Sequence, residues 1–286
     1  MIFVSLGSGS SGNATLVSTG EESLLIDCGL SYRRIREGLD ALGISMESLS
    51  GVLLTHEHAD HIKGLKRLMS AHRIPVFGSL GTLESLAQAS GDEYFRYAGR
   101  ELLCPVGLCR PFEIGSFSVT GFPVYHDAAM PCAWRMELTQ PETALSLTGN
   151  DNYVPRRQVS CCVLTDCGHF DDEICAWLKD LDLLLLEANH DRAMLSLGPY
   201  PMALKRRIMS SAGHLSNHAA GQLISEILNP RLRHVYLAHL SRENNTPAKA
   251  IETVRGEVAA ACGQRAAETL SLSAAPRDGL SLITEL

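Results

Sequence analysis

The stretch Val-Leu-Leu-Thr-His-Glu-His-Ala-Asp-His, residues 52–61, places three histidines and an aspartate within six positions. The apolar residues at its start predict a buried strand, and the amphipathic pattern that follows predicts a helix, so the polar groups lie at a strand-to-helix junction. Packing of a hydrophobic core gives no reason to crowd imidazole and carboxylate groups there. The stretch is instead typical of a metal site, because these groups are common metal ligands.

The spacing within this stretch divides the four side chains into two pairs. His56 and His58 are two residues apart, which puts them on one face of an extended segment. Asp60 and His61 fall on the first turn of the following helix and can serve a second point close by. A single histidine is more often a core or surface residue than a ligand, but four such groups at this spacing reverse that expectation.

Outward from this stretch, the composition is that of an ordinary globular chain. The 286 residues are 45% hydrophobic and 20% charged, which is enough for a sizeable core. No apolar run approaches the roughly 20 residues of a membrane span, and the N-terminal residues lack the pattern of a signal peptide. The nine cysteines are scattered without a Cys-x-x-Cys pair, which indicates reduced thiols. We therefore expect a cytoplasmic protein with no membrane partner, and the sequence indicates no oligomeric state.

The formal net charge of −7 argues against a protein that binds nucleic acid only through a basic surface. Two bound divalent cations would add about four positive charges at one point, however, and the local charge decides what a site attracts. Basic residues that could follow a nucleic-acid backbone are Arg33, Arg34, Arg36, Lys63, Lys66, Arg67, Arg156, Arg157, Lys205, Arg206 and Arg207. Most of them are more simply explained as solvated helix faces.

Strands and helices alternate in both halves of the chain. We expect strands at residues 2–7, 14–19, 23–27, 52–55, 75–78, 159–165, 182–187, 234–238, 268–273 and 279–284, with a β-rich region at 101–139. We expect helices at residues 31–42, 81–90, 171–179, 201–210 and 217–228, and another from the histidine cluster to about residue 72. Because the helices are few enough to cover only outer faces, we expect two sheets stacked between two helical layers, in a single domain over residues 1–286.

The polar segment 140–157 interrupts this alternation. It carries Pro141, Gly149 and Pro155 around the sequence Asn-Asp-Asn at 150–152, and these residue types are typical of turns and loops. We therefore expect a surface insertion, either a loop or the tip of a hairpin, that could form a lid or a partner contact.

Residues 55–61, Thr-His-Glu-His-Ala-Asp-His, resemble the signature of the metallo-β-lactamase superfamily, and the resemblance extends over nearly the whole chain. The fold of that superfamily, a four-layer αββα sandwich of the α/β (α+β) class, matches the layering expected above. The superfamily uses three further ligands, and each has a match that follows an apolar strand. The ligands so implied are His56, His58 and His126 for a first metal, Asp60, His61 and His239 for a second, and Asp166 bridging both.

The aspartate at position 166 separates branches of that superfamily. Enzymes that cleave lactams often carry cysteine for the second metal, whereas phosphodiesterase and hydrolase branches carry the bridging aspartate. Two metals roughly 3.5–4 Å apart can hold a hydroxide between them and brace the attacking and leaving oxygens. The resemblance therefore implies phosphodiester hydrolysis by attack of a bridging hydroxide on phosphorus, with two divalent ions. Zinc is expected first, and manganese or iron are alternatives because the same ligands accept them.

Four further stretches, residues 5–13, 186–191, 213–217 and 238–245, look like the WalJ (YycJ) family of small nucleases with this fold. Members are regarded as single-domain 5′-to-3′ DNA exonucleases that lack the β-CASP domain of larger relatives, and this chain has no room for that domain. The resemblance implies nucleic acid, DNA in the first place, as the substrate.

The same landmarks are similar to tRNase Z, in which a glutamate and a histidine form a helper dyad. On that similarity His214 would donate a proton to the leaving oxygen, and Glu187 would orient and charge its imidazole. Asp60 would also accept a proton from the attacking water. The simpler alternative is that His214 only precedes a helix capped by Ser216 and that Glu187 is an anchor. His190 fits either a contact near the metals or plain surface exposure.

The Gly/Ser-rich loop at residues 7–13 could offer backbone N–H groups to a phosphate, because glycine allows close approach. We expect substrate contacts from Ser8, Ser10, Ser11 and Asn13, although such a run is also an ordinary turn.

Two other functions stay open at this point. One is a phosphodiesterase for small cyclic or activated phosphates, which the low basicity favours and the Gly-His-Leu-Ser stretch at 213–216 disfavours. The other is a non-catalytic regulatory module stabilised by metal, which is disfavoured because none of the seven implied ligands is missing.

Overall fold

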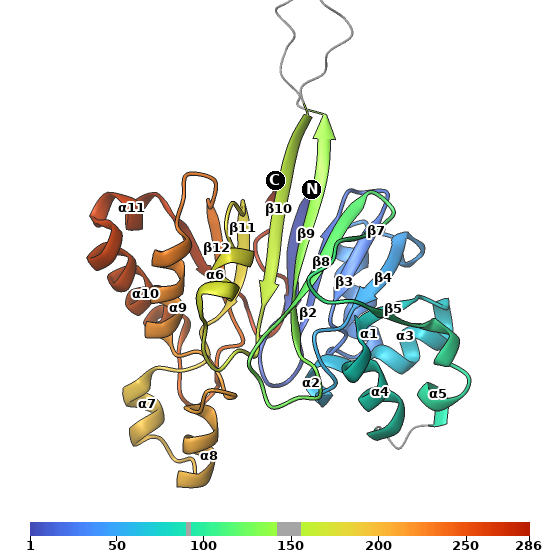
Figure 1. Cartoon of the computed structure of the whole chain (residues 1–286), viewed down its shortest axis with the longest axis horizontal. Helices are drawn as coiled ribbons and strands as arrows, with labels where there is room; N and C mark the ends of the chain where they lie inside the picture. Colours follow the sequence, from blue (N-terminus) through green and yellow to red (C-terminus); the bar gives the residue numbers. More distant parts are fainter. Residues whose placement is uncertain (90–92, 142–155) are drawn as a thin grey trace, which may run out of the picture.

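The structure is a computed structural model that describes residues 1–89, 93–141 and 156–286. Two seven-stranded sheets pack face to face, and helices cover the outer face of each, as Figure 1 shows. This arrangement confirms the predicted αββα sandwich. Among the described residues, no helix is both long and apolar enough to cross a membrane.

The first sheet is built mainly from the first 106 residues and runs in the order β14-β1-β2-β3-β4-β5-β6. Parallel pairing joins β3 to β4, β4 to β5 and β5 to β6. The strands are β1 (Ile2–Gly7), β2 (Ala14–Ser18), β3 (Ser23–Ile26), β4 (Leu49–Leu53), β5 (Val76–Ser79), β6 (Leu103–Val106) and β14 (Thr284–Glu285). The 3₁₀ and α-helices of this half are α1 (Tyr32–Ala41), η1 (Met46–Ser48), α2 (Ala59–Ile62), α3 (Leu65–His72), α4 (Leu80–Ala89), α5 (Glu93–Arg96) and η2 (Arg100–Leu102).

The second sheet runs in the order β13-β12-β11-β10-β9-β8-β7, and its strands β10 to β13 are parallel. Its strands are β7 (Phe112–Ile114), β8 (Phe117–Pro123), β9 (Cys132–Pro141), β10 (Arg156–Leu164), β11 (Leu183–Glu187), β12 (His234–Ala238) and β13 (Ser271–Ala274). The helices of this half are α6 (Asp172–Trp177), α7 (Arg192–Leu197), α8 (Met202–Ile208), α9 (Asn217–Ile227), α10 (Pro247–Cys262) and α11 (Gln264–Thr269).

Apolar side chains on both faces of the strands produce three separate cores. Along β3, Leu24 and Ile26 pack between the sheets, whereas Leu25 faces the helices, because successive side chains alternate across a strand. Trp134 from the second sheet lies in the central core and is fully buried. Such double burial explains why the parallel strands appear in the sequence as continuous apolar runs.

Several predicted boundaries are wrong for identifiable reasons. The helix expected to run to residue 72 breaks into α2 and α3 at Gly64, where an added Cβ would lie 2.3 Å from the Leu30 carbonyl oxygen. The strand expected at 268–273 begins only at Ser271, because residues 264–269 form α11: Gly263 with φ 92° ends α10, and alanines follow it. The last strand, β14, pairs with β1 at only two positions. Helices α7 and α10 were not predicted.

The predicted insertion at 140–157 falls largely on residues 142–155, which lie outside the described residues. Its two ends are strands and not loop, because β9 and β10 pair antiparallel as far as Pro141 and Arg156. The hairpin formed by β9 and β10 is seen in Figure 1.

Candidate metal centre

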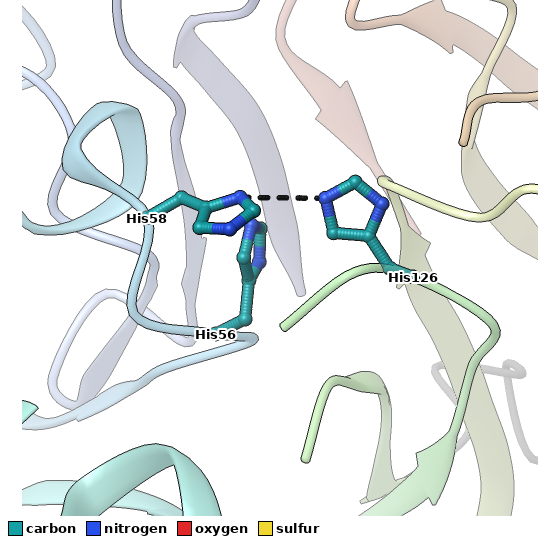
Figure 2. Close-up of side chains that lie close together, drawn as sticks. All are labelled: His56, His58 and His126. Atoms are coloured by element: carbon teal, nitrogen blue, oxygen red, sulfur yellow. Dashed lines mark hydrogen bonds between the residues drawn. The ribbon is translucent and has the colours of Figure 1, made fainter. Parts of the chain in front are cut away.

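Three histidines from two distant loops converge beside the sandwich. His56 and His58 follow β4, whereas His126 follows β8, and Figure 2 shows the three rings facing one another. Nδ1 of His58 lies 3.4 Å from Nε2 of His126. One ligand atom from each of the three residues lies within 4.8 Å of the others, which is close enough to share a cation.

A second group lies next to the first. It consists of Asp60, His61 and His239, whose ligand atoms also lie within 4.8 Å of one another. Nε2 of His239 is 3.5 Å from Oδ2 of Asp60, and Nε2 of His61 is 3.7 Å from the same oxygen. The group therefore joins helix α2 to the loop after β12.

Asp166, which follows β10, lies between the two groups. Its carboxylate is 3.2 Å from Nε2 of His61 and 3.7 Å from Nε2 of His126. Burial alone would raise the pKa of Asp166, but the imidazoles of His239 and His61 outweigh it and hold the pKa well below its usual value. The carboxylate is thus ionised and contacts both groups of candidate ligands.

In three of the imidazoles, Nδ1 makes a hydrogen bond to a neighbouring group. Nδ1 of His61 donates to Asp27 at 2.8 Å, and Nδ1 of His126 donates to the Gly213 carbonyl oxygen at 3.0 Å. Oγ1 of Thr55 donates to Asp27 and accepts from Nδ1 of His56 at 3.0 Å. Such bonds fix the ring and turn Nε2 toward the centre, where a cation would bind.

Several buried polar atoms at the centre have no hydrogen-bond partner among the described residues, as expected where metal ions would bind. Nε2 of His56, Oδ2 of Asp166 and Nε2 of His239 are buried and make no hydrogen bond within the part of the chain that the structure describes. Buried polar atoms without a partner are rare in proteins. Burial also lowers the pKa of His56 and so keeps the neutral form that binds metals. Clustered histidine and aspartate groups of this kind are typical of a two-metal site, and the residues fit such ions.

Asp27 was missed by the sequence reasoning. It follows β3 and accepts hydrogen bonds from the backbone N–H of Thr55 and from its hydroxyl, both at 2.9 Å, besides the bond from His61. The loop of Asp27 also fits closely against the ligand loop, because an added Cβ at Gly29 would lie 1.6 Å from the Asp60 carbonyl oxygen. An acidic residue directly after an apolar strand was the available signal.

Three of the residues at the centre have left-handed backbone conformations. The φ angles are 60° at Asp27, 57° at Asp166 and 55° at His239. Residues other than glycine rarely adopt this region, and asparagine, aspartate and histidine do so most readily. The turn at each strand end therefore aims the side chain into the centre at a cost in backbone strain.

The residues predicted to bind substrate divide into two pairs. Ser8 and Asn13 are buried, and the Ser8 hydroxyl accepts the backbone N–H of His239 at 2.8 Å. The Asn13 amide donates to Nε2 of His61 at 3.1 Å. Ser10 and Ser11 are exposed and line open surface beside Asp60. The structure thus gives Ser8 and Asn13 partners inside the protein, and contact of any of the four with substrate stays a prediction.

Glu187 and His214 are brought together as predicted for a dyad. Nδ1 of His214 donates to Oε1 of Glu187 at 2.8 Å, and Nδ1 of His239 donates to the same oxygen at 2.9 Å. The other oxygen accepts the backbone N–H groups of Cys167 and Leu215. Burial would raise the pKa of Glu187, but these partners, His214 first, lower it to about 2. The buried glutamate is therefore anionic and touches both His214 and a candidate ligand.

His190 lies apart from these groups. Its side chain is buried, its Nδ1 makes no hydrogen bond to the described residues, and burial lowers its pKa to about 4. It belongs to none of the clusters of potential metal ligands among the described residues.

An open pocket of about 270 Å³ gives access to the centre. Its walls include His58, Asp60, Asp166, His214 and His239. A wider groove of about 810 Å³, which passes Ser11, Lys63 and Phe95, shares Ser10 and Asp60 with the pocket.

Comparisons with known proteins agree with this geometry. Residues 22–239 match the β-lactamase superfamily domain. The chain is 33% identical to the exodeoxyribonuclease YycJ of Bacillus anthracis over 243 aligned residues. The aligned region covers 85% of this chain and 83% of that protein. It is 31% identical to the exodeoxyribonuclease WalJ of Streptococcus pneumoniae over 261 aligned residues. Here the aligned region covers 90% of this chain and 87% of that protein.

A solved structure supports the fold. Zn²⁺-bound PqqB from Methylobacterium extorquens superposes over 100% of both chains with a TM-score of 0.64 and 18% sequence identity. At this identity the likeness concerns the fold alone.

Proposed function

The chain belongs to the metallo-β-lactamase superfamily and is a metal-dependent hydrolase, and we propose that it hydrolyses DNA progressively from a 5′ end. Two relatives named exodeoxyribonuclease support the substrate, because each is more than 30% identical to this chain over most of its length. The observation that carries the reaction type is the position of Asp166. A carboxylate between two groups of ligands suits a pair of metals that act on one phosphodiester.

We assign the ligands according to the two groups. Three imidazoles with one carboxylate suit zinc, and oxygen-rich coordination at the second position would also accept manganese or iron. The assigned ligands are His56, His58 and His126 for the first ion, Asp60, His61 and His239 for the second, and Asp166 for both.

Divalent ions bound in this way would act as Lewis acids and lower the pKa of a water molecule. Asp60 is a quarter exposed in the pocket, so its carboxylate can accept a proton from that water. His214 also lines the pocket and can donate a proton to the leaving oxygen. The hydrogen bond to the buried, anionic Glu187 orients the His214 ring and favours its charged form.

A phosphodiesterase for small cyclic or activated phosphates is the second candidate. The net charge of −7 and the modest pocket of about 270 Å³ favour a small substrate. The groove of about 810 Å³ that continues from the pocket favours a polymer, because a small molecule would leave it empty. A purely regulatory module has less support, since all seven candidate ligands converge.

Substrate competition separates the two candidates. Purified protein with zinc or manganese is given 5′-labelled single-stranded and duplex DNA, RNA, a cyclic nucleotide and bis-p-nitrophenyl phosphate. We expect release of the labelled terminal nucleotide from DNA, and loss of all activity after chelation. Hydrolysis of the small esters with no cleavage of any nucleic acid would reject the nuclease proposal in favour of the second candidate.

A further inference from the structure

Helix α8 lines the pocket together with several of the candidate ligands. Tyr200, Leu204 and Ile208 contribute apolar surface to the pocket, and Arg207 adds a guanidinium group. Positions 204, 207 and 208 lie on one face of a helix, so α8 turns this face toward the centre. Arg207 is the one lysine or arginine among the described residues that line the pocket.

The Arg207 side chain is oriented by a single partner. Its Nε donates to Oδ2 of Asp127 at 2.6 Å, and Oδ1 of Asp127 is 3.4 Å from Nε2 of His126. The backbone N–H of Asp127 in turn donates to the Ala212 carbonyl oxygen at 3.2 Å. The guanidinium is therefore held close to the three-histidine group by an aspartate that is itself fixed.

The other two nitrogens of the guanidinium are available to a ligand. The Arg207 side chain makes no other hydrogen bond to the described residues, and it is 55% exposed. A guanidinium presents its N–H groups in a planar fork that matches two oxygens of a phosphate. An anchored and partly exposed fork beside a metal centre is suited to a second phosphate, next to the one that the metals would bind.

The pocket and the groove differ in size and in the residues that line them. The groove is the wider of the two and is lined by exposed residues such as Ser11 and Lys63, whereas α8 stands against the pocket. A pocket of about 270 Å³ lies near the lower limit of small-ligand sites, which range from roughly 300 to 1,000 Å³. A strand entering along the groove would thus have room for one nucleotide beyond the centre.

We propose that the pocket beneath α8 receives the terminal nucleotide of the DNA strand and that Arg207 binds its 5′-phosphate. The inference rests on the proposed nuclease function and adds the element that selects a chain end. Tyr200 and Leu204 offer apolar contacts to the base and sugar, while Arg207 meets the charge. The small volume of the pocket, about 270 Å³, would limit removal to one nucleotide at a time.

The test compares single-stranded oligonucleotides that carry either a 5′-phosphate or a 5′-hydroxyl. Charge-assisted hydrogen bonds to a phosphate predict that kcat/KM is roughly 10- to 100-fold higher for the phosphorylated strand. Arg207→Gln should abolish this preference, and Arg207→Lys should retain part of it, since the charge remains without the fork. Arg206→Gln is the matched control, because Arg206 is exposed on the same helix and does not line the pocket.

Binding gives a second readout. Fluorescence anisotropy of the same oligonucleotides with metal-free protein should show the same order of affinities, and thermal melting verifies that each variant folds. An equal rate for both strands with the native protein, or an undiminished preference in Arg207→Gln, would overturn the role of Arg207 while the nuclease function stands. Absence of DNA cleavage together with hydrolysis of bis-p-nitrophenyl phosphate would instead reject the nuclease function itself.

Discussion

The two halves of the molecule contribute to the candidate metal centre in different ways. The first half supplies four candidate ligands from the single stretch 56–61, and the buried carboxylate of Asp27 holds one of them, His61. The second half supplies three from separate loops after β8, β10 and β12, and adds the Glu187–His214 pair. On the proposed assignment, the first half would hold ions with a compact local motif, whereas the second half would bring the bridging carboxylate and the proton donor His214. Variants in each half should fail in different ways.

The largest effect is expected where the halves meet. Asp166→Asn removes the charge between the two groups of ligands, and a neutral amide cannot replace it as a bridge. We expect hydrolysis to fall to background and metal content to fall from two ions per chain to one or none. Elemental analysis with a kinetic assay measures both. Full activity with two ions bound would show that the two groups do not need a bridging carboxylate.

A loss of proton transfer without a loss of metal is expected at His214. His214→Gln should lower kcat by about 10²–10⁴-fold, the range of general acid catalysis, with two ions still bound. The control is Ser216→Ala, which removes the hydroxyl that caps α9 and tests whether the region is only structural. If His214→Gln and Ser216→Ala reduce kcat equally, the dyad serves only to position the loop.

Substitution of Asp27, which supports the candidate ligands of the first half, should lower metal affinity before it affects the chemical step. Asp27→Asn loses the charge that orients His61, and changes of this kind cost about 10–100-fold in metal affinity. We expect activity to return at higher zinc or manganese concentration, in contrast to His214→Gln. Titration of activity against free metal distinguishes the two, and activity of Asp27→Asn that does not depend on metal concentration would contradict this division between the halves.

The smallest effect is expected from thiol reagents. Cys28 next to Asp27 and Cys167 next to Asp166 are both buried, and burial raises the pKa of Cys167 to about 12. Only Cys109 and Cys262 are exposed among the nine cysteines. Native protein should therefore show two fast-reacting thiols and unchanged activity after their modification. Rapid labelling of Cys28 or Cys167, identified by mass spectrometry, would reveal that one half opens in solution.

The same contrast explains how much of the centre could be predicted from the sequence. The stretch 56–61 is local, so its spacing alone indicates a ligand group. His126, Asp166 and His239 have no such spacing, and they were found through the family resemblance and their place after apolar strands. All seven are brought together in the structure, although their roles as ligands stay a proposal.

What the sequence could not provide depends on contacts between distant segments. Asp27 matters because β3 pairs in parallel with β4, which places its carboxylate beneath Thr55 and His61. Ser8 turns inward because the backbone of His239 needs an acceptor there. Neither requirement is visible until both strands are in place. The strand expected at 268–273 exists as β13 but begins later, at Ser271, and this has a local cause, since Gly263 with its positive φ is followed by the helix α11.

The left-handed backbone at Asp27, Asp166 and His239 limits how this protein can change. A β-branched residue at position 166 would have to adopt a conformation that such residues rarely tolerate. Exchange of that one side chain would strain the turn, so compensating mutations in the adjoining loop should come first. In laboratory evolution toward a new reaction, substitutions in the outer helices should accordingly be tolerated more often than substitutions in the three turns at the strand ends.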